Sequence, residues 1–347
     1  MTEYGFFSRA LHRLTLDSKA IARASFELDQ AVAKTDISTT TNQKHVFVSG
    51  LARSATTVLL TSLFETGTFS TLTYRDMPFV LMPNIWRRLS RFSKRSNSQA
   101  ERAHGDGILI GFDSPEAFEE VFWRVFYSDH YLFDDHIGEM DSDESIVQDF
   151  RKYIASLLAG ESNSRYLSKN NNNIVRLPAI RSAFPNSVII VPFREPLQHA
   201  LSLKRQHEIF SRKQEKDSFV RDYMTWLGHH EFGLDHRPFR FYNDTSPKSA
   251  DSFNYWLALW KDVYQYLDTS APKDTIFVSY EVLCSQTNEV LSALADEAHV
   301  SWLPHHSDRF TARTRDPGED FEKALVSDCQ NIYERLTNRM RRSLNLS

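Results

Sequence analysis

The sequence predicts an α/β fold of the P-loop-like, three-layer type, in which a central parallel sheet is flanked by helices. Short β-branched runs, HVFVSG, NSVIIVPFREP and DTIFVSYEV, are separated by polar breaks and helical patterns. Strands that alternate with helices are typical of a parallel sheet covered on both faces. The first run also leads through a tight turn into a helix, as phosphate-binding loops do.

The chain length allows one large α/β domain or two small ones, since it has 347 residues, 41% of them apolar and 25% charged. We predict a single domain over 1–347, with an N-terminal helical segment at 1–40 and a loop or lid at 90–107. The formal net charge of −4 gives no overall attraction for nucleic acid or for an anionic membrane. Any anion site must therefore be local.

Cysteine use and hydropathy indicate the compartment. Cys284 and Cys329 are the two cysteines, and neither has CxxC or Cys/His metal spacing, so a disulfide framework or a structural zinc is not expected. Charged residues interrupt every hydrophobic run in the first forty residues, and no stretch approaches the roughly 18 apolar residues that span a bilayer. We predict a cytoplasmic protein without an integral membrane segment.

The remaining elements follow from local signals. Apolar positions at helical spacing predict a helix from about Asp17 to Lys34, followed by a polar linker. A second helix is expected over 114–127, with Ser114 as its N-cap and Pro115 at its first position. Charged or amide-rich stretches at 139–145, 170–173 and 211–218 are expected to be solvated loops.

The turn after the first strand has the frame of a phosphate-binding loop but lacks its lysine. Against the pattern GxxxxGK[ST], Ala55 replaces the second glycine and Thr56 replaces the lysine. Backbone N–H groups at a helix N-terminus still favour an anion. A kinase would lose the cation that reaches the transferring phosphoryl group, so a P-loop kinase is the weaker interpretation.

The stretch GLARSATT at 50–57 resembles the 5′-phosphosulfate loop of PAPS-dependent sulfotransferases, most closely the [PA]RSGTT version of the carbohydrate and tyrosylprotein branches. The resemblance implies PAPS as co-substrate, no metal, and adenosine 3′,5′-bisphosphate as product. It also implies a planar fork from Arg53 for sulfuryl and phosphate oxygens. The other donor-binding positions would be Ser54, Ala55, Thr56 and Thr57, with alanine at 55 where the family has glycine. An ordinary Ser/Thr-capped turn is the alternative.

A second stretch, IIVPFREPLQHALSL, supports the same resemblance. Arg194 ends a predicted strand and Ser202 lies eight residues on, within the following helix. In the resembled family this unit holds the 3′-phosphate of the donor. An arginine at the carboxyl end of a parallel strand faces the crevice where such sheets bind ligands. The alternative is that Arg194 is a surface ion-pair partner.

Two further segments are similar to family motifs. YLSKNNNN resembles the K[TND]P-type segment, although its proline is replaced by Asn171 or absent, and Lys169 would stabilise charge on the bridging oxygen of the donor. VSYEVL resembles the V-x-Y-E-x-L segment, in which Tyr280 would line the nucleotide pocket. A solvated lysine and a core-packing tyrosine are the alternatives. The matches run from about 46 to 295.

Sulfuryl transfer needs a base that takes the proton of the acceptor hydroxyl. The tyrosylprotein-like branch has a glutamate after the loop arginine, and TLTYRDMPFVLMP places Asp76 there, with helix capping as the alternative. His104 is the rival base or a mobile surface histidine. Asp106 and Asp113, in the same segment, could bind substrate hydroxyls. The sequence GHHEFGLDHRPF is not a zinc motif and is expected to be an acceptor-side loop.

We therefore predict a sulfotransferase that moves a sulfuryl group from PAPS to an acceptor hydroxyl, without a metal ion. The expected acceptor is a carbohydrate, a glycolipid or another small metabolite, and the sequence does not choose among them. Two alternatives stay open. One is a kinase-like phosphotransferase, and the other is a non-catalytic nucleotide-binding module that kept the fold.

Overall fold

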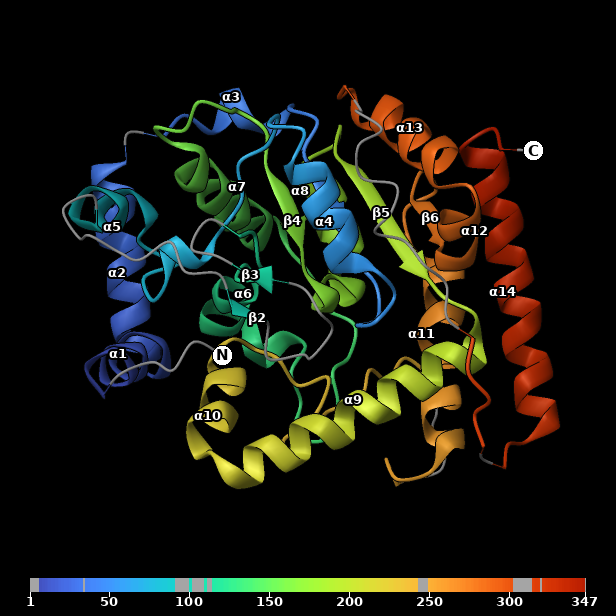
Figure 1. Ribbon diagram of the computed structural model, residues 1–347. Coiled ribbons are helices and arrows are strands. Elements are labelled where there is room, and N and C mark those ends of the chain that lie inside the picture. The colour runs from blue at the N-terminus through green and yellow to red at the C-terminus, as the bar shows by residue number, and fades with distance from the viewer. Residues whose placement is uncertain are drawn as a thin grey trace.

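A central sheet with helices on both faces forms the body of the protein (Figure 1). The computed structural model describes residues 6–33, 35–90, 100–101, 109–110, 114–242, 249–301, 314–318 and 320–346. Within them, four parallel strands lie in the order β4-β1-β5-β6. They are β1 (Val46–Val48), β4 (Leu167–Lys169), β5 (Val188–Phe193) and β6 (Ile276–Ser279). The predicted α/β fold with a central parallel sheet is confirmed.

Helices connect and cover these strands. Those before β5 are α1 (Phe6–His12), α2 (Lys19–Val32), α3 (Ile37–Thr41), α4 (Thr56–Phe64), α5 (Pro83–Ser90), α6 (Glu120–Tyr127), α7 (Glu144–Leu158) and α8 (Leu177–Ala183). After β5 come α9 (Pro196–Lys216), α10 (Ser218–Trp226), α11 (Phe253–Ser270), α12 (Tyr280–Ser285), α13 (Thr287–Ala298) and α14 (Lys323–Ser343). Short helical turns are η1 (Arg13–Asp17), η2 (Tyr74–Asp76), η3 (Ser128–His130) and η4 (Asn171–Arg176).

The three-layer arrangement follows from the alternation of side chains along each strand. Val46 and Val48 of β1 join a buried cluster that contains Leu60 of α4 and residues of α13. Phe47, between them, points to the other face and packs on Phe150 of α7. All three residues of β1 are fully buried, so both faces of the central strand lie in the core.

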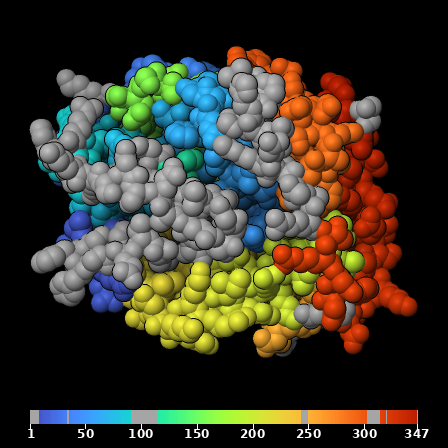
Figure 2. Space-filling model, viewed as in Figure 1, coloured from blue at the N-terminus to red at the C-terminus, as the bar shows by residue number. Residues whose placement is uncertain are grey.

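The outer helices close the sides of the molecule. On the face shown in Figure 2, α14 (red) forms one side and α9 and α10 (yellow) form the lower edge. Helix α14 packs against α11 and β6, and α9 packs against α11 and α10. Among the residues described, none of the helices combines the length and the apolar character that crossing a membrane requires.

Several elements agree with the predictions. The three predicted strands are β1, β5 and β6, the helix expected from Asp17 to Lys34 is α2, and the helix after Arg194 is α9. Of the loop or lid predicted at 90–107, the structure describes Ser90 and the strand β2 (Ala100–Glu101), which pairs antiparallel with β3 (Leu109–Ile110). The rest of that segment lies outside the described residues.

The helix predicted over 114–127 begins later than expected. Helix α6 starts at Glu120, and Ser114 is not its N-cap. The preceding residues are extended instead, because Pro115 forms a bridge with Thr73 and the Glu116 N–H donates to the Leu72 carbonyl at 3.2 Å. A tertiary pairing therefore overrides the local capping signal.

The charged stretch at 211–218 was predicted to be a loop, and this prediction is wrong. Helix α9 continues through it to Lys216, and Asp217 alone separates α9 from α10, whose N-cap it is. The buried side chains of Phe210 and Gln214 extend the inner face of α9 into this stretch. Packing on that face thus outweighs the polar composition.

The asparagine run at 170–173 was also predicted to be solvated, and it is buried instead. It leads from β4 into η4. Its four side-chain Nδ2 groups donate, in chain order, to Glu120 Oε2, Glu231 Oε1, the Gly228 carbonyl and Glu119 Oε1. Buried amides need such partners, and these four bonds fix the segment that follows β4.

A buried ion pair completes this anchor. Arg176 donates from Nη2 to both carboxylate oxygens of Glu120 at 3.1 Å, and neither side chain is more than 1% exposed. The Arg176 guanidinium also lies over the rings of Trp123 and Tyr131, 4.6 and 4.4 Å from their centroids. Because Asn170 donates to the same carboxylate, the pair ties α6 to the end of β4.

We predict that Arg176→Met lowers the free energy of unfolding by about 3–5 kcal/mol, because it leaves the Glu120 charge buried without its cation. Urea unfolding at pH 7 measures the change. Arg335→Met is the matched control, since Arg335 pairs with Asp268 at an exposed site, with 56% of its side chain accessible, and should cost less than about 1 kcal/mol. Similar losses in the two variants would contradict the prediction.

Candidate functional site

Four of the predicted site groups follow the four parallel strands at one edge of the sheet. Lys169 is the last residue of β4, the loop at 49–55 follows β1, Arg194 follows β5 and Tyr280 follows β6. Parallel strands end on the same side, so the topology brings these groups to the carboxyl edge of the sheet. This edge is where open α/β sheets bind ligands.

Gly50 sets how the loop leaves the sheet. The preceding Ser49 N–H donates to the Ile190 carbonyl at 2.9 Å, which extends the pairing of β1 with β5. A Cβ at residue 50 would lie 2.7 Å from the Pro192 carbonyl oxygen, which is a backbone atom and cannot move aside cheaply. Glycine is therefore required here for the close approach of two backbones.

Two residues of the loop have left-handed backbone conformations. Arg53 has φ 73° and Ala55 has φ 77°, and α4 begins directly after Ala55 with Thr56. Left-handed residues next to a helical turn direct successive backbone N–H groups toward one point, and such a concavity binds anions. The helix N-terminus adds to the same field. The left-handed conformation at position 55 explains why the resembled family has glycine there. Ala55 adopts it at the cost of some backbone strain.

The hydroxyl side chains of the loop have different surroundings. Ser54 is fully buried, and its Oγ donates to the Leu51 carbonyl at 2.7 Å, so its proton stabilises the turn itself. Thr56 is buried at the first position of α4, and Thr57 follows it at an intermediate exposure. The loop backbone and Arg53 are therefore the main groups that it presents for an anion.

A side-chain contact joins the two predicted anion motifs. The Nε–H of Arg53 donates to Ser202 Oγ at 3.3 Å, across 149 positions of sequence. Ser202 lies in the second turn of α9, whose N-cap is Glu195. The loop after β1 and the strand-helix unit around β5 therefore meet at one place.

Arg194 is held from two sides. Its guanidinium lies over the Tyr280 ring, 4.9 Å from the centroid, and its Nε is 3.9 Å from Glu281 Oε1. The side chain is 15% exposed. Burial, with a smaller effect of Cys284, raises the pKa of Tyr280 to about 12, so this ring remains a neutral aromatic surface for the cation.

His199 contacts the loop and was not predicted from the sequence. It is fully buried, and its Nε2 is 2.8 Å from the Ala52 carbonyl oxygen. Burial and the nearby charges of Arg194 and Arg53 lower the pKa of His199 to about 3. Both guanidinium groups are thus close enough to act on one ring. The available signal was its spacing, three residues before Ser202 on the same helix face.

Lys169 and Asp76 lie on the side of β4. Lys169 is 7% exposed and is in register with Val48, immediately before the loop. The chain before Asp76 runs parallel to the chain before β4 at one point, where Ser70 bridges Tyr166. Asp76 itself forms a capping box with Thr73, and its Oδ1 accepts from Arg87 Nε at 2.8 Å.

Other predicted groups are placed as follows. His104, Asp106 and Asp113 lie outside the described residues. In the histidine-rich segment, His229 Nδ1 is 3.4 Å from Glu231 Oε2, and burial lowers the pKa of His236 to about 4. Across the part of the chain that the structure describes, no group of three or more His, Cys, Asp or Glu side chains is arranged to hold a metal ion.

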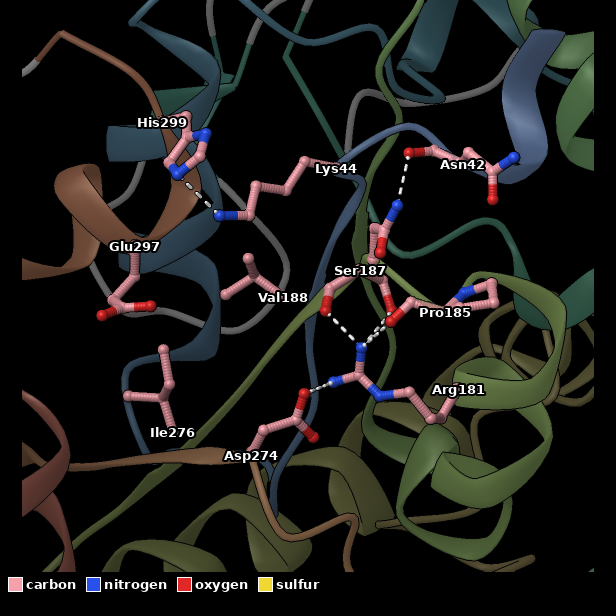
Figure 3. Close-up of a pocket in the computed structure, with 11 residues that line it drawn as sticks. Asn42, Lys44, Arg181, Pro185, Ser187, Val188, Asp274, Ile276, Glu297 and His299 are labelled. Atoms are coloured by element: carbon pink, nitrogen blue, oxygen red, sulfur yellow. Dashed lines mark hydrogen bonds and ion pairs between the residues drawn. The ribbon is translucent and has the colours of Figure 1, made fainter.

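A cavity of about 490 Å³ lies at the opposite edge of the sheet (Figure 3). Its lining includes residues that precede or begin β1, β5 and β6, such as Lys44, Val188 and Ile276. Four of its polar side chains form two pairs: Arg181 with Asp274 at 2.8 Å, and Lys44 Nζ with His299 Nε2 at 2.9 Å. None of the predicted site residues that the structure describes lines it.

Comparison with known proteins agrees with the geometry. The model of the sulfotransferase family matches residues 45–304, which is more than half of the chain. The chain belongs to the sulfotransferase family. Among solved structures, this sulfotransferase is similar to one from Mycobacterium tuberculosis, with 11% identity, a TM-score of 0.51, and 97% of this chain and 88% of that chain covered.

A sulfotransferase from Mycobacterium avium is also similar, with 13% identity, a TM-score of 0.52, and 98% of this chain and 87% of that chain covered. At these identities the likeness concerns the fold. Curated proteins gave no significant sequence match to this sulfotransferase.

We predict that Ala55→Gly raises the free energy of unfolding by about 0.5–1 kcal/mol. A left-handed alanine costs roughly 1–2 kcal/mol, and the extra freedom of glycine in the unfolded chain offsets part of the gain. Chemical denaturation measures it. Ala24→Gly, at an exposed position inside α2, is the control and should lose about 1 kcal/mol. A loss of stability in both variants would show that position 55 does not need glycine.

Proposed function

We propose that this sulfotransferase transfers a sulfuryl group from PAPS to a hydroxyl group of a carbohydrate, a glycolipid or another small metabolite. We place it near the carbohydrate and tyrosylprotein branches because of the loop at 50–57. The observation that carries the proposal is the contact between Arg53 and Ser202, which joins two anion motifs at one edge of the sheet. A donor with a phosphosulfate at one end and a ribose phosphate at the other requires two such motifs.

The residues present fit that donor. The left-handed loop and the N-terminus of α4 supply backbone N–H groups for the phosphosulfate, with Arg53 as the cation. Arg194, held by the Tyr280 ring, supplies a charge for the 3′-phosphate, together with Ser202. A triphosphate would bring more negative charge to a loop that has Thr56 where kinases have lysine, so the phosphosulfate is the better match.

In the proposed reaction the acceptor oxygen forms a bond to sulfur as the bond between sulfur and the bridging oxygen breaks. The electron pair of the broken bond stays on the phosphate of adenosine 3′,5′-bisphosphate. Arg53, in the loop after β1, and Lys169, at the end of β4, stabilise this developing charge. The proton of the acceptor hydroxyl goes to a base. With Cys284 and Cys329 both unpaired, we expect the reaction to take place in the cytoplasm.

For the base we propose Asp76, with His104 as the alternative. The Asp76 carboxylate is fixed by Thr73 and by Arg87, so its orientation is set before an acceptor binds. Each carboxylate oxygen can accept two hydrogen bonds, and among the described residues Oδ1 accepts one, from Arg87 Nε. The same contacts stabilise the turn η2, so a test must separate catalysis from capping.

We predict that Arg194→Ala weakens binding of adenosine 3′,5′-bisphosphate by at least about tenfold, since it removes a charge-assisted contact to the 3′-phosphate. Isothermal titration calorimetry measures it, and labelled PAPS with mixed acceptors measures transfer. Arg212→Ala is the control, because Arg212 lies on α9 with 69% of its side chain exposed. Unchanged affinity in Arg194→Ala would overturn the assignment.

The two alternative functions have their own tests. Magnesium-dependent ATP turnover would favour a kinase, and nucleotide binding without transfer would favour a non-catalytic module.

We predict that Asp76→Asn lowers kcat by about 100-fold or more while affinity for adenosine 3′,5′-bisphosphate persists. Arg87→Met is the matched control, because it breaks the same ion pair and keeps the carboxylate. Arg87→Met should lose at least as much thermal stability as Asp76→Asn, because Arg87 also pairs with Glu161 and donates to the Leu157 carbonyl. Asp76→Asn alone should lose transfer. Equal transfer rates in the two variants would show that Asp76 is only a cap, and His104→Gln would then be tested as the base.

A further inference from the structure

His199 is a buried polar group to which the proposed reaction gives no role. It lies four residues into α9 and is 0% exposed. A carbonyl oxygen only accepts hydrogen bonds, so the 2.8 Å contact with Ala52 places the imidazole proton on Nε2. Among the described residues, Nδ1 has no hydrogen-bond partner. The neutral tautomer therefore has one bond, and this bond goes to the loop.

The Ala52 carbonyl, which accepts the hydrogen bond from His199, lies directly before a left-handed residue of the loop. It belongs to the peptide group that joins Ala52 to Arg53, and Arg53 is the residue with φ 73°. Rotation about this φ would turn the Arg53 side chain and the following N–H groups away from their present direction. A left-handed conformation persists in a residue other than glycine only where its surroundings hold it. The hydrogen bond from His199 is such a restraint.

The same helix face holds the loop at a second point. Ser202 lies three residues after His199 and accepts from Arg53 Nε at 3.3 Å. His199 thus fixes the backbone before Arg53, and Ser202 fixes its side chain. From these contacts we infer that His199 is a positioning residue, which keeps the phosphosulfate loop in its anion-binding conformation. It needs no contact with the donor to do so.

A neutral ring suits this position better than a charged one. The charges of the Arg53 and Arg194 guanidinium groups both act on His199, so a positive charge on its ring would be repelled by both. Lysine or arginine at 199 could donate to the Ala52 carbonyl but would add that charge. Histidine gives the donor without the charge, so the two cations remain available to balance the charge of an anion.

This inference rests on the proposed function, and its consequence is selective. Loss of the bond should disturb the group that grips the 5′-phosphosulfate and leave Arg194 and Tyr280 in place. His199→Phe keeps the ring volume and removes the donor. This variant should weaken the binding of adenosine 3′,5′-bisphosphate about tenfold and raise the KM for PAPS. Its affinity for adenosine 3′-phosphate should stay the same.

His199→Gln should restore most of the loss, because a glutamine amide reaches about as far as Nε2. His199→Asn should not restore it, because its amide reaches only to the Nδ1 position. The comparison of His199→Gln with His199→Asn also tests the inference if His199→Phe does not fold. The control is His207→Gln, on the same helix, where Nδ1 accepts from the Gly233 N–H at 3.3 Å, away from the loop. It should leave both affinities unchanged.

Calorimetry with the two nucleotides, together with the melting temperature of each variant, separates the outcomes. If wild-type protein binds neither nucleotide, the proposed function fails. If wild-type protein binds both nucleotides, and His199→Phe leaves both affinities unchanged or lowers both by the same factor, the inference about His199 is wrong. The inference is also wrong if glutamine and asparagine behave alike.

Discussion

The parallel pairing of β1 with β5 determines where the loop at 49–55 and Arg194 lie. The two strands are in register from Val46 with Val188 to Val48 with Ile190, and the pairing continues through the Ser49 N–H. Both chains then leave the sheet in the same direction. Because Gly50 lets the first loop pass directly against Pro192, the loop stays beside the strand that carries Arg194. The contact of Arg53 with Ser202 follows from this arrangement.

The site concentrates positive charge in a protein whose formal net charge is −4. Contacts within the site hold these cations in place. Arg194 lies on an aromatic face and 3.9 Å from the carboxylate of Glu281, which is too far for a direct hydrogen bond. His199, whose pKa burial and both guanidinium charges lower to about 3, stays neutral. Cations that are oriented in this way stabilise developing negative charge with little reorganisation.

The sequence predicted what local patterns encode. The β-branched runs located β1, β5 and β6, and the spacing of Arg194 and Ser202 placed them on one strand-helix unit. It missed β4 as a strand, because Leu167–Lys169 is short and two of its three residues are polar. It also took the asparagines at 170–173 for a solvated loop. Their partners, such as Glu120 and Glu231, lie 50 or more positions away, and no local pattern reports such contacts.

The loop illustrates why strain and attachment must be considered together. Arg53 and Ala55 both occupy left-handed conformations that cost free energy in residues with a Cβ. Bonds from three parts of the chain hold the turn: Ser49 to β5, Ser54 within the loop, and His199 from α9. All three use backbone atoms of the loop or its flanks, and all exist without any ligand. The free-energy cost of the strained turn is therefore offset during folding rather than during binding. An anion then binds to a loop that is already formed.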